Sequence, residues 1–169
     1  MSTTTISPPL AARASTLART AGVAVVLVGI LVLLGWAFDV SAFKSIVPGL
    51  ATMKANTALA IVLAGGALGV EARASSSHRR KLLSAICAAA AFLIGTLTLL
   101  EYAGGWQFGI DQLLVADPAS PIWPGRMTLI SALNCAMIGL ALLLRRFPRA
   151  SAFVRTLIFA TLFTELVTL

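Results

Sequence analysis

Residues 82–100 read LLSAICAAAAFLIGTLTLL, a run of 19 residues without a charge. As a helix this run would extend about 28 Å, close to the hydrocarbon thickness of a bilayer. Three consecutive basic residues, 79–81, precede the run, and Glu101 follows it. We therefore expect residues 82–100 to cross a membrane as an α-helix with the basic end in the cytoplasm.

The composition of the whole chain supports the same environment. Of its 169 residues, 59% are apolar and 11% are charged, and the mean hydropathy is +0.95. Soluble domains are about 45–50% apolar and about 25% charged, so the composition excludes an ordinary soluble globule and a disordered chain. The fold class expected is therefore an all-α integral membrane protein.

Four further apolar runs predict a total of five membrane-spanning helices. The first run is longer than the apolar part of a cleaved signal peptide, so we expect it to be retained. Residues 1–20 are expected to form a disordered or interfacial cytoplasmic lead, and 21–169 the helix bundle, with an outer loop at 101–126. The expected helices are 21–38, 54–70, 82–100, 127–144 and 152–169.

The distribution of basic residues sets the orientation. With the N-terminus in the cytoplasm, ten of the 13 Lys and Arg residues lie inside, and only Lys44, Lys54 and Arg126 lie outside. This bias accounts for the net charge of +7 without nucleic acid, which we exclude as a partner. The expected location is a membrane, which the chain crosses several times, with the lipid bilayer as a partner.

Two stretches of the chain resemble each other at an offset of 74 residues. Residues 53–68 and 127–142 share a Met, an Ala-Leu pair and a later Gly, and Pro-Gly precedes each at 48–49 and 124–125. Both copies enter the membrane from outside, so they predict a parallel repeat of a helical hairpin. The repeat would take the last helix about six residues past Leu169, so we expect the chain to be the front part of a longer protein.

Small residues recur four positions apart in three of the expected helices. This spacing lets helix backbones approach closely in lipid. We expect packing within the chain, while a homodimer face and a coincidence of composition stay open. The helix-packing candidates are Gly65, Gly69, Ala91, Gly95 and Gly139.

The outer loop has the densest set of aromatic and charged side chains. One interpretation is a sensing lid over the bundle, because aromatic faces and carboxylates can bind a ligand. The other is an interfacial loop in which Asp111 caps a short helix over 112–115. No spacing typical of a metal site occurs, and we expect no cofactor. The candidate residues are Glu101, Tyr102, Trp106, Asp111, Trp123 and Arg126.

Besides a few Ser and Thr residues, two asparagines and one acid lie inside apolar segments, namely Asn56, Asn134 and Glu165. Polar groups are costly in lipid, so they mark contacts within the bundle or functional positions. For both asparagines we expect hydrogen bonds between helices. For Glu165 a structural hydrogen bond with a neighbour such as Thr161 or Thr164, a place at the outer interface and a sensing role all stay open.

Residues 45–68, 99–114 and 124–142 resemble the multi-helix membrane sensor region at the N-terminus of bacterial sensor histidine kinases and related signalling proteins. In that group a Pro-Gly turn and an Asn-Thr-Ala-Leu type helix start recur around an outer Gly-Ile-Asp loop. The chain departs from the pattern at Ile130, where an Asn is expected. The resemblance implies a sensory input module in a bacterial inner membrane that acts on a cytoplasmic output domain or protein. It implies no catalytic activity in this segment, although a full-length parent could be a histidine kinase.

Two other function classes stay open from the sequence. A structural or assembly subunit of a membrane complex would need a stable partner. A small transporter or channel subunit would need a polar pathway through the apolar helices.

Overall fold

The computed structural model describes residues 8–45, 52–71, 77–117 and 123–167, and every regular element in these ranges is helical. The all-α class is therefore confirmed for the described residues. Three features of the predictions above lie outside these ranges: residues 1–7 of the lead, the first Pro-Gly at 48–49 and the last two residues of the last expected helix. The elements are α1 (Pro8–Ala37), α2 (Ser41–Lys44), α3 (Ala55–Glu71), α4 (His78–Gly104), η1 (Ile110–Gln112), α5 (Leu129–Leu144), η2 (Pro148–Ala150) and α6 (Ser151–Val167).

Three helices are long and apolar enough to cross a membrane: Ala12–Ala37 within α1, α4, and Pro148–Val167, which includes α6. Helices α3 and α5 are also apolar, but they have only 17 and 16 residues. At 1.5 Å per residue each extends about 25 Å, slightly less than the bilayer core. A membrane protein with three candidate spans follows from the structure, and the five-span topology stays a prediction.

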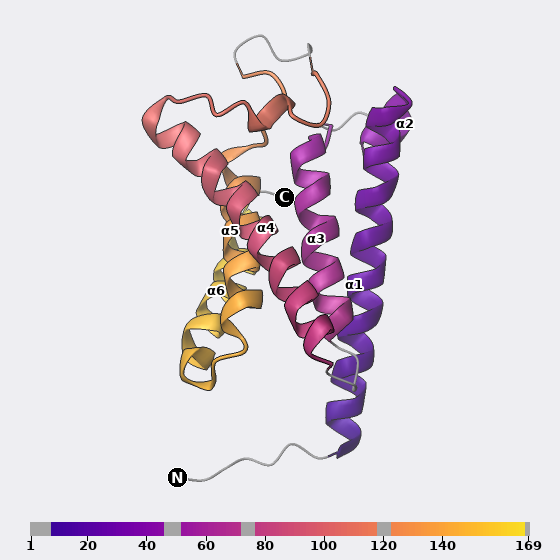
Figure 1. Ribbon diagram of the computed structural model, residues 1–169, viewed down its shortest axis with the longest axis vertical. Coiled ribbons are helices and arrows are strands. Elements are labelled where there is room, and N and C mark those ends of the chain that lie inside the picture. The colour runs from indigo at the N-terminus through magenta and orange to yellow at the C-terminus, as the bar shows by residue number, and fades with distance from the viewer. Residues whose placement is uncertain (1–7, 46–51, 72–76, 118–122, 168–169) are drawn as a thin grey trace.

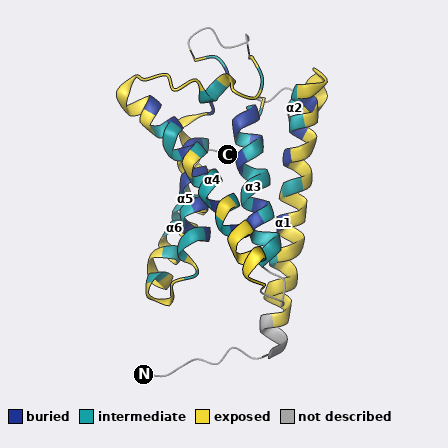
Figure 2. Cartoon of the chain, in the orientation of Figure 1, coloured by how far each residue is buried: buried dark blue, intermediate teal, exposed yellow. Residues whose placement is uncertain are grey.

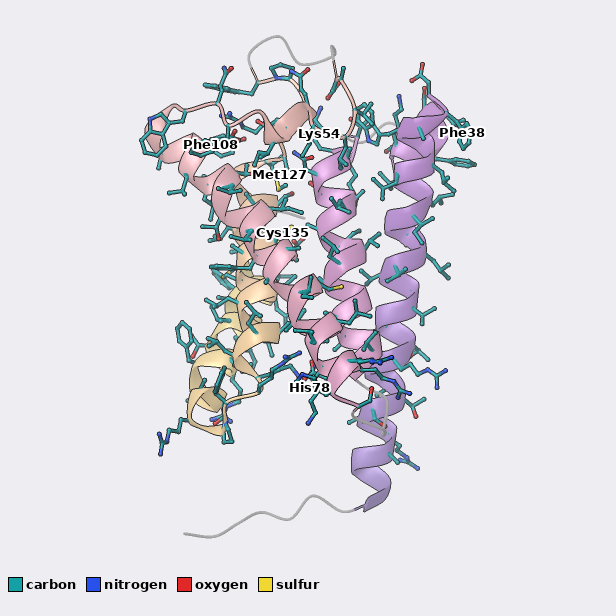
Figure 3. The ribbon with its side chains drawn as sticks, in the orientation of Figure 1. Phe38, Lys54, His78, Phe108, Met127 and Cys135 are labelled. Carbon is teal, nitrogen blue, oxygen red and sulfur yellow. The ribbon has the colours of Figure 1, made fainter. Side chains whose placement is uncertain are left out.

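The helices run up and down in chain order (Figure 1). Helix α3 packs beside α1 and α4, α4 packs along α5, and α6 packs mainly against α5. Lys54 and Met127, which precede α3 and α5, lie at one end of the molecule, and His78 lies at the other (Figure 3). We call the first end the cap end. We call the opposite end, at which α3 and α5 terminate, the base.

The core is built from small side chains on α3, α4 and α5 (Figure 2). Buried alanines dominate it, among them Ala58, Ala67, Ala88 and Ala132. By contrast, α6 has no buried residue, and most of α1 is exposed. Their outward side chains are leucine, valine, isoleucine and phenylalanine, which suit contact with lipid.

Helix α1 begins well before the expected first span. The lead was predicted to be disordered or interfacial up to residue 20, yet the helix is continuous from Pro8. Proline is favoured at the first turn of a helix, and the alanine, leucine and arginine residues that follow have high helix propensity. The disordered alternative is therefore wrong for residues 8–20.

Helix α4 ends later than expected, and this moves the start of the outer loop. It continues through Glu101 and Tyr102 to Gly104, and Gly105 follows with φ +66°. That left-handed conformation, which glycine adopts at little cost, is a common end of a helix. Glu101 and Tyr102 are therefore in the last turns of α4, so the predicted loop boundary at 101 is wrong. At the other side of the loop, α5 begins at Leu129 with the Thr128 side chain accepting from the Ser131 N–H at 3.1 Å.

Candidate functional site

Arg126 is the centre of a buried charged cluster at the cap end. Its side chain is 2% exposed, and its Nε lies 2.7 Å from Asp111 Oδ2. Its Nη2 lies 3.4 Å from Glu101 Oε2 and donates to the Trp106 carbonyl at 3.2 Å. One guanidinium therefore contacts the end of α4, the loop after it and η1. We call Glu101, Asp111 and Arg126 the cap cluster.

A tight turn presents Arg126 to the cluster. Gly125 precedes it with φ +75°, and a Cβ at Gly125 would lie 2.3 Å from the Asp111 carbonyl oxygen. Both the backbone conformation and the close approach require glycine here. The Pro-Gly step at 124–125, which the sequence marked as a turn, thus places the arginine against η1.

Glu101 is fully enclosed, with its side chain 0% exposed. Its Oε1 accepts from the Phe108 N–H at 2.7 Å, which closes the loop after α4 onto the helix. Its Oε2 has no hydrogen-bond partner among the described residues, and neither has Nη1 of Arg126. Two buried carboxylates share one guanidinium, so the cluster retains hydrogen-bonding capacity for water or a small polar ligand.

Aromatic rings cover the arginine. The Arg126 Cζ lies 4.3 Å from the centre of the Trp123 ring and 5.4 Å from that of Tyr102. The Tyr102 hydroxyl donates to the Met127 carbonyl at 2.9 Å, which joins the end of α4 to the approach to α5. Trp106 contacts the guanidinium through its carbonyl, and its ring packs on Phe108, with 5.8 Å between ring centres. These rings strengthen the cluster by cation–π contact and exclude water from one side.

Helix α3 is tied to the same cluster. The Asn56 side-chain amide donates to the Ile110 carbonyl at 3.0 Å and to Asp111 Oδ1 at 3.5 Å. Asn56 was expected to bond another membrane helix, and it bonds η1 instead, because it lies in the first turn of α3 directly below the loop. Lys54 forms an ion pair with Asp117, whose side chain is 4% exposed. Polar side chains therefore join the loop to the start of α3 and to the last turns of α4, and Arg126 itself lies three residues before α5.

A small cleft opens on the cap cluster. It has a volume of about 180 Å³ and is lined by Glu101, Gln107, Asp111, Gln112, Trp123 and Arg126 among others. Its lining offers carboxylates, amides and a guanidinium beside the apolar surface of Trp123 and Pro124. Among the described residues no group of three His, Cys, Asp or Glu side chains is placed to hold a metal ion. The cleft suits a small polar molecule that both donates and accepts hydrogen bonds.

The idea that Asp111 caps a helix over 112–115 is wrong. The helical turn is η1, Ile110–Gln112, and its N-cap is Gly109. Asp111 instead pairs with Arg126 and accepts from Asn56. A buried charged partner stabilises the carboxylate more than a short exposed turn would, which is why Asp111 faces inward.

The other two polar residues that the sequence marked in apolar segments meet between α5 and α6. The Asn134 side-chain amide donates to Glu165 Oε1, and the Thr164 hydroxyl donates to Asn134 Oδ1 at 2.7 Å. Asn134 thus forms the expected bond between helices. Of the interpretations left open for Glu165, the geometry matches the structural hydrogen bond, and Asn134 is a partner that it makes on α5. Glu165 and the cap cluster are separate features of the described structure.

Four of the five small-residue candidates lie at contacts between helices. Gly65 lies against Gly22 of α1, where an added Cβ would be 2.8 Å from the Gly22 carbonyl oxygen. Gly95 and Gly139 lie in the α4–α5 contact, and Ala91 is 1% exposed. Gly69 differs, because a Cβ there would meet nothing within 4 Å.

Sequence reasoning missed the roles of Lys54 and Asp117 and the anchoring of α1 at the cap end. The Trp36 ring N–H donates to the Met53 carbonyl at 2.8 Å, and Lys44 lies 4.5 Å from the centre of the same ring. Opposite charges in an outer loop and beside a helix start were visible in the sequence, but their pairing depends on the fold. Comparison of the chain with known proteins found no match, either to a protein-family model, to a curated protein or to a solved structure.

Proposed function

We propose that this chain is the membrane-embedded sensory input module of a bacterial signal-transduction protein, in which the cleft at the cap cluster receives the signal. The observation that carries the proposal is that one buried arginine contacts both carboxylates of the cleft and links the loop to α4 and α5. A ligand that competes for these carboxylates or for the free Nη1 changes the contacts of Arg126. Such a change biases the relative positions of the helices that end at the base.

The proposed topology has five spans, an N-terminus in the cytoplasm and a parallel repeat of two helical hairpins. Helices α3 and α5 are short, but Lys54 precedes one and Arg145 follows the other. Long basic side chains reach the interface from such positions and compensate for a short apolar stretch. In this topology the cap cluster faces the outside, and the base, with most of the arginines, faces the cytoplasm.

The sensory role requires an output. We propose that a cytoplasmic signalling domain or protein, of the kind found with sensor histidine kinases, receives the movement at the base. The resemblance of residues 45–68, 99–114 and 124–142 to that group supports this part of the proposal, and the cap geometry supports the input site.

The test uses the native membrane protein together with any coding sequence that adjoins it. The signalling output of the wild type is compared with that of Arg126→Gln, and with that of Arg149→Gln as a control for the loss of one positive charge. Arg149 is exposed and lies outside the cap cluster. We expect Arg126→Gln alone to lock or abolish the output. A chain with no adjoining signalling domain and no co-purifying signalling protein would contradict the proposal.

A further inference from the structure

An apolar groove lies between α5 and α6 near the base. It has a volume of about 330 Å³, and its walls include Ile138 and Leu142 of α5, Ile158 and Leu162 of α6, and Leu68 of α3. The groove exists because α6 has no buried residue and joins α5 through polar side chains at Asn134 and Glu165. Apolar surface of this shape inside a membrane is matched by hydrocarbon.

One end of the groove carries excess positive charge. Arg145, which lines the groove, places its Nε 3.6 Å from Glu71 Oε2, and Arg146 Nε lies 4.0 Å from Glu71 Oε1. A single carboxylate therefore faces two guanidinium groups. Arg146 is also fixed by donating to the Lys81 carbonyl at 2.7 Å, whereas the Arg145 side chain stays 36% exposed. The exposed guanidinium can therefore bind a second anion by donating hydrogen bonds to it.

We propose that the groove binds one acyl chain of an anionic phospholipid, with the lipid phosphate on Arg145. The apolar walls match the acyl chain, and the excess charge at the end of α5 matches the headgroup. Ile138 precedes Arg145 by seven residues, so the two lie about 10 Å apart along the helix axis. A lipid whose phosphate is at Arg145 therefore extends its chain along the groove toward Ile138. This inference does not depend on the proposed sensory function; in the proposed topology the lipid belongs to the inner leaflet.

The headgroup is tested by titrating the full chain in mild detergent with phosphatidylglycerol and with phosphatidylethanolamine, and counting bound lipids by native mass spectrometry. We expect phosphatidylglycerol to bind the wild type more tightly. Because one charge-assisted contact is removed, Arg145→Gln should weaken phosphatidylglycerol binding about tenfold. Arg149→Gln removes the same charge outside the groove and should leave binding unchanged. Equal binding of the two lipids, or equal effects of the two substitutions, would overturn the proposal.

The acyl-chain site is tested by filling the groove. Ile138→Trp should abolish retention of phosphatidylglycerol, whereas Leu93→Trp, on an exposed position of α4 outside the groove, should not. Retention by Ile138→Trp at the wild-type level, or a dimer of the wild type that excludes lipid, would reject the site.

A second measurement applies if Ile138→Trp does not fold. Leu162→Trp places a fluorophore on the groove wall, while the native Trp36, Trp106 and Trp123 report from other parts of the chain. One equivalent of phosphatidylglycerol with brominated acyl chains should quench the new tryptophan more than it quenches Leu93→Trp. Equal quenching of the two variants would count against the groove.

Discussion

Two polar junctions in this bundle differ in kind. At the cap end, α3, α4 and α5 meet a loop through the cap cluster, Asn56 and the pair of Lys54 with Asp117. At the α5–α6 junction, one asparagine meets Glu165 and Thr164, and α6 buries no residue. The first junction is enclosed, charged and shared by several elements, whereas the second is a local contact beside an open groove.

This difference indicates which part of the molecule can move without the rest. Charges that are buried and shared make several elements cooperative, because the loss of one partner leaves the others unpaired in a low-dielectric site. A single hydrogen-bonded contact between two helices in lipid stabilises only that pair. We therefore expect the cap end to respond as a unit and α6 to separate from α5 independently.

The largest expected effect follows from the loss of Arg126. Arg126→Leu leaves Glu101 and Asp111 enclosed without their cation, so we expect a loss of about 3–5 kcal/mol in the free energy of unfolding. Unfolding by denaturant in detergent micelles measures it. Repeating the measurement in the background of Asp111→Asn isolates the pair, and additive losses would show that the two residues do not interact.

A smaller effect is expected at the α4–α5 backbone contact, which supports the cap junction from below. A Cβ at Gly95 would lie 2.5 Å from the Ala136 nitrogen, so Gly95→Ala should force the helices apart and cost about 1–3 kcal/mol. Gly66→Ala is the matched control, because its Cβ meets nothing within 4 Å. Thermal unfolding compares them; equal melting temperatures would mean that the α4–α5 contact is less close than described.

The α5–α6 junction should be weaker. Glu165→Leu removes the oxygen that accepts from the Asn134 side-chain amide. Hydrogen bonds between membrane helices contribute on average about 0.6 kcal/mol and at most about 1.7 kcal/mol. We expect faster hydrogen exchange within α6 and unchanged exchange in the cap. Glu165→Gln retains an oxygen acceptor and should behave like the wild type. A Glu165→Leu effect that reaches η1 would show that the two junctions are coupled.

The smallest effect is expected at the exposed pair of Asp39 and Lys44, which lies beside the cap end but outside the cap cluster. Lys44 lowers the pKa of Asp39 below its ordinary value of 3.8, by a hydrogen bond and by its charge. Any stabilisation is therefore present above pH 3.8 and is lost as the pH falls through the lower pKa of the folded state. Because the Asp39 side chain is 92% exposed, Asp39→Asn should leave the melting temperature at pH 7 unchanged. A clear decrease in the melting temperature would mean that this exposed pair stabilises the fold as the cap cluster does.

The sequence predicted the helices better than their ends. Apolar runs located the helices α1, α3, α4, α5 and α6, because a helix in lipid needs a long stretch of mostly apolar residues. The beginning of α1 at Pro8 and the end of α4 at Gly104 were missed, since helix propensity and a left-handed glycine extend both helices beyond their uncharged runs. Hydropathy alone does not indicate where these two helices begin and end.

The candidate site was predicted as a set of residues but not as an arrangement. Glu101, Asp111 and Arg126 were identified because charged residues between apolar helices are few. Their convergence depends on the Gly125 turn and on η1, which fold the loop back over α4 and α5. Lys54 gave no signal beyond its charge, because its partner Asp117 lies 63 positions away in the chain.

Hydrogen exchange of Arg126→Gln in lipid nanodiscs tests the central claim, that one arginine joins the loop to the helices at the cap end, most directly. We predict that protection falls together in the last turn of α4, in residues 105–117 and in the first turns of α3 and α5, while α6 keeps its wild-type rates. A loss of protection confined to residues 123–128, or one spread evenly over the chain including α6, would contradict it.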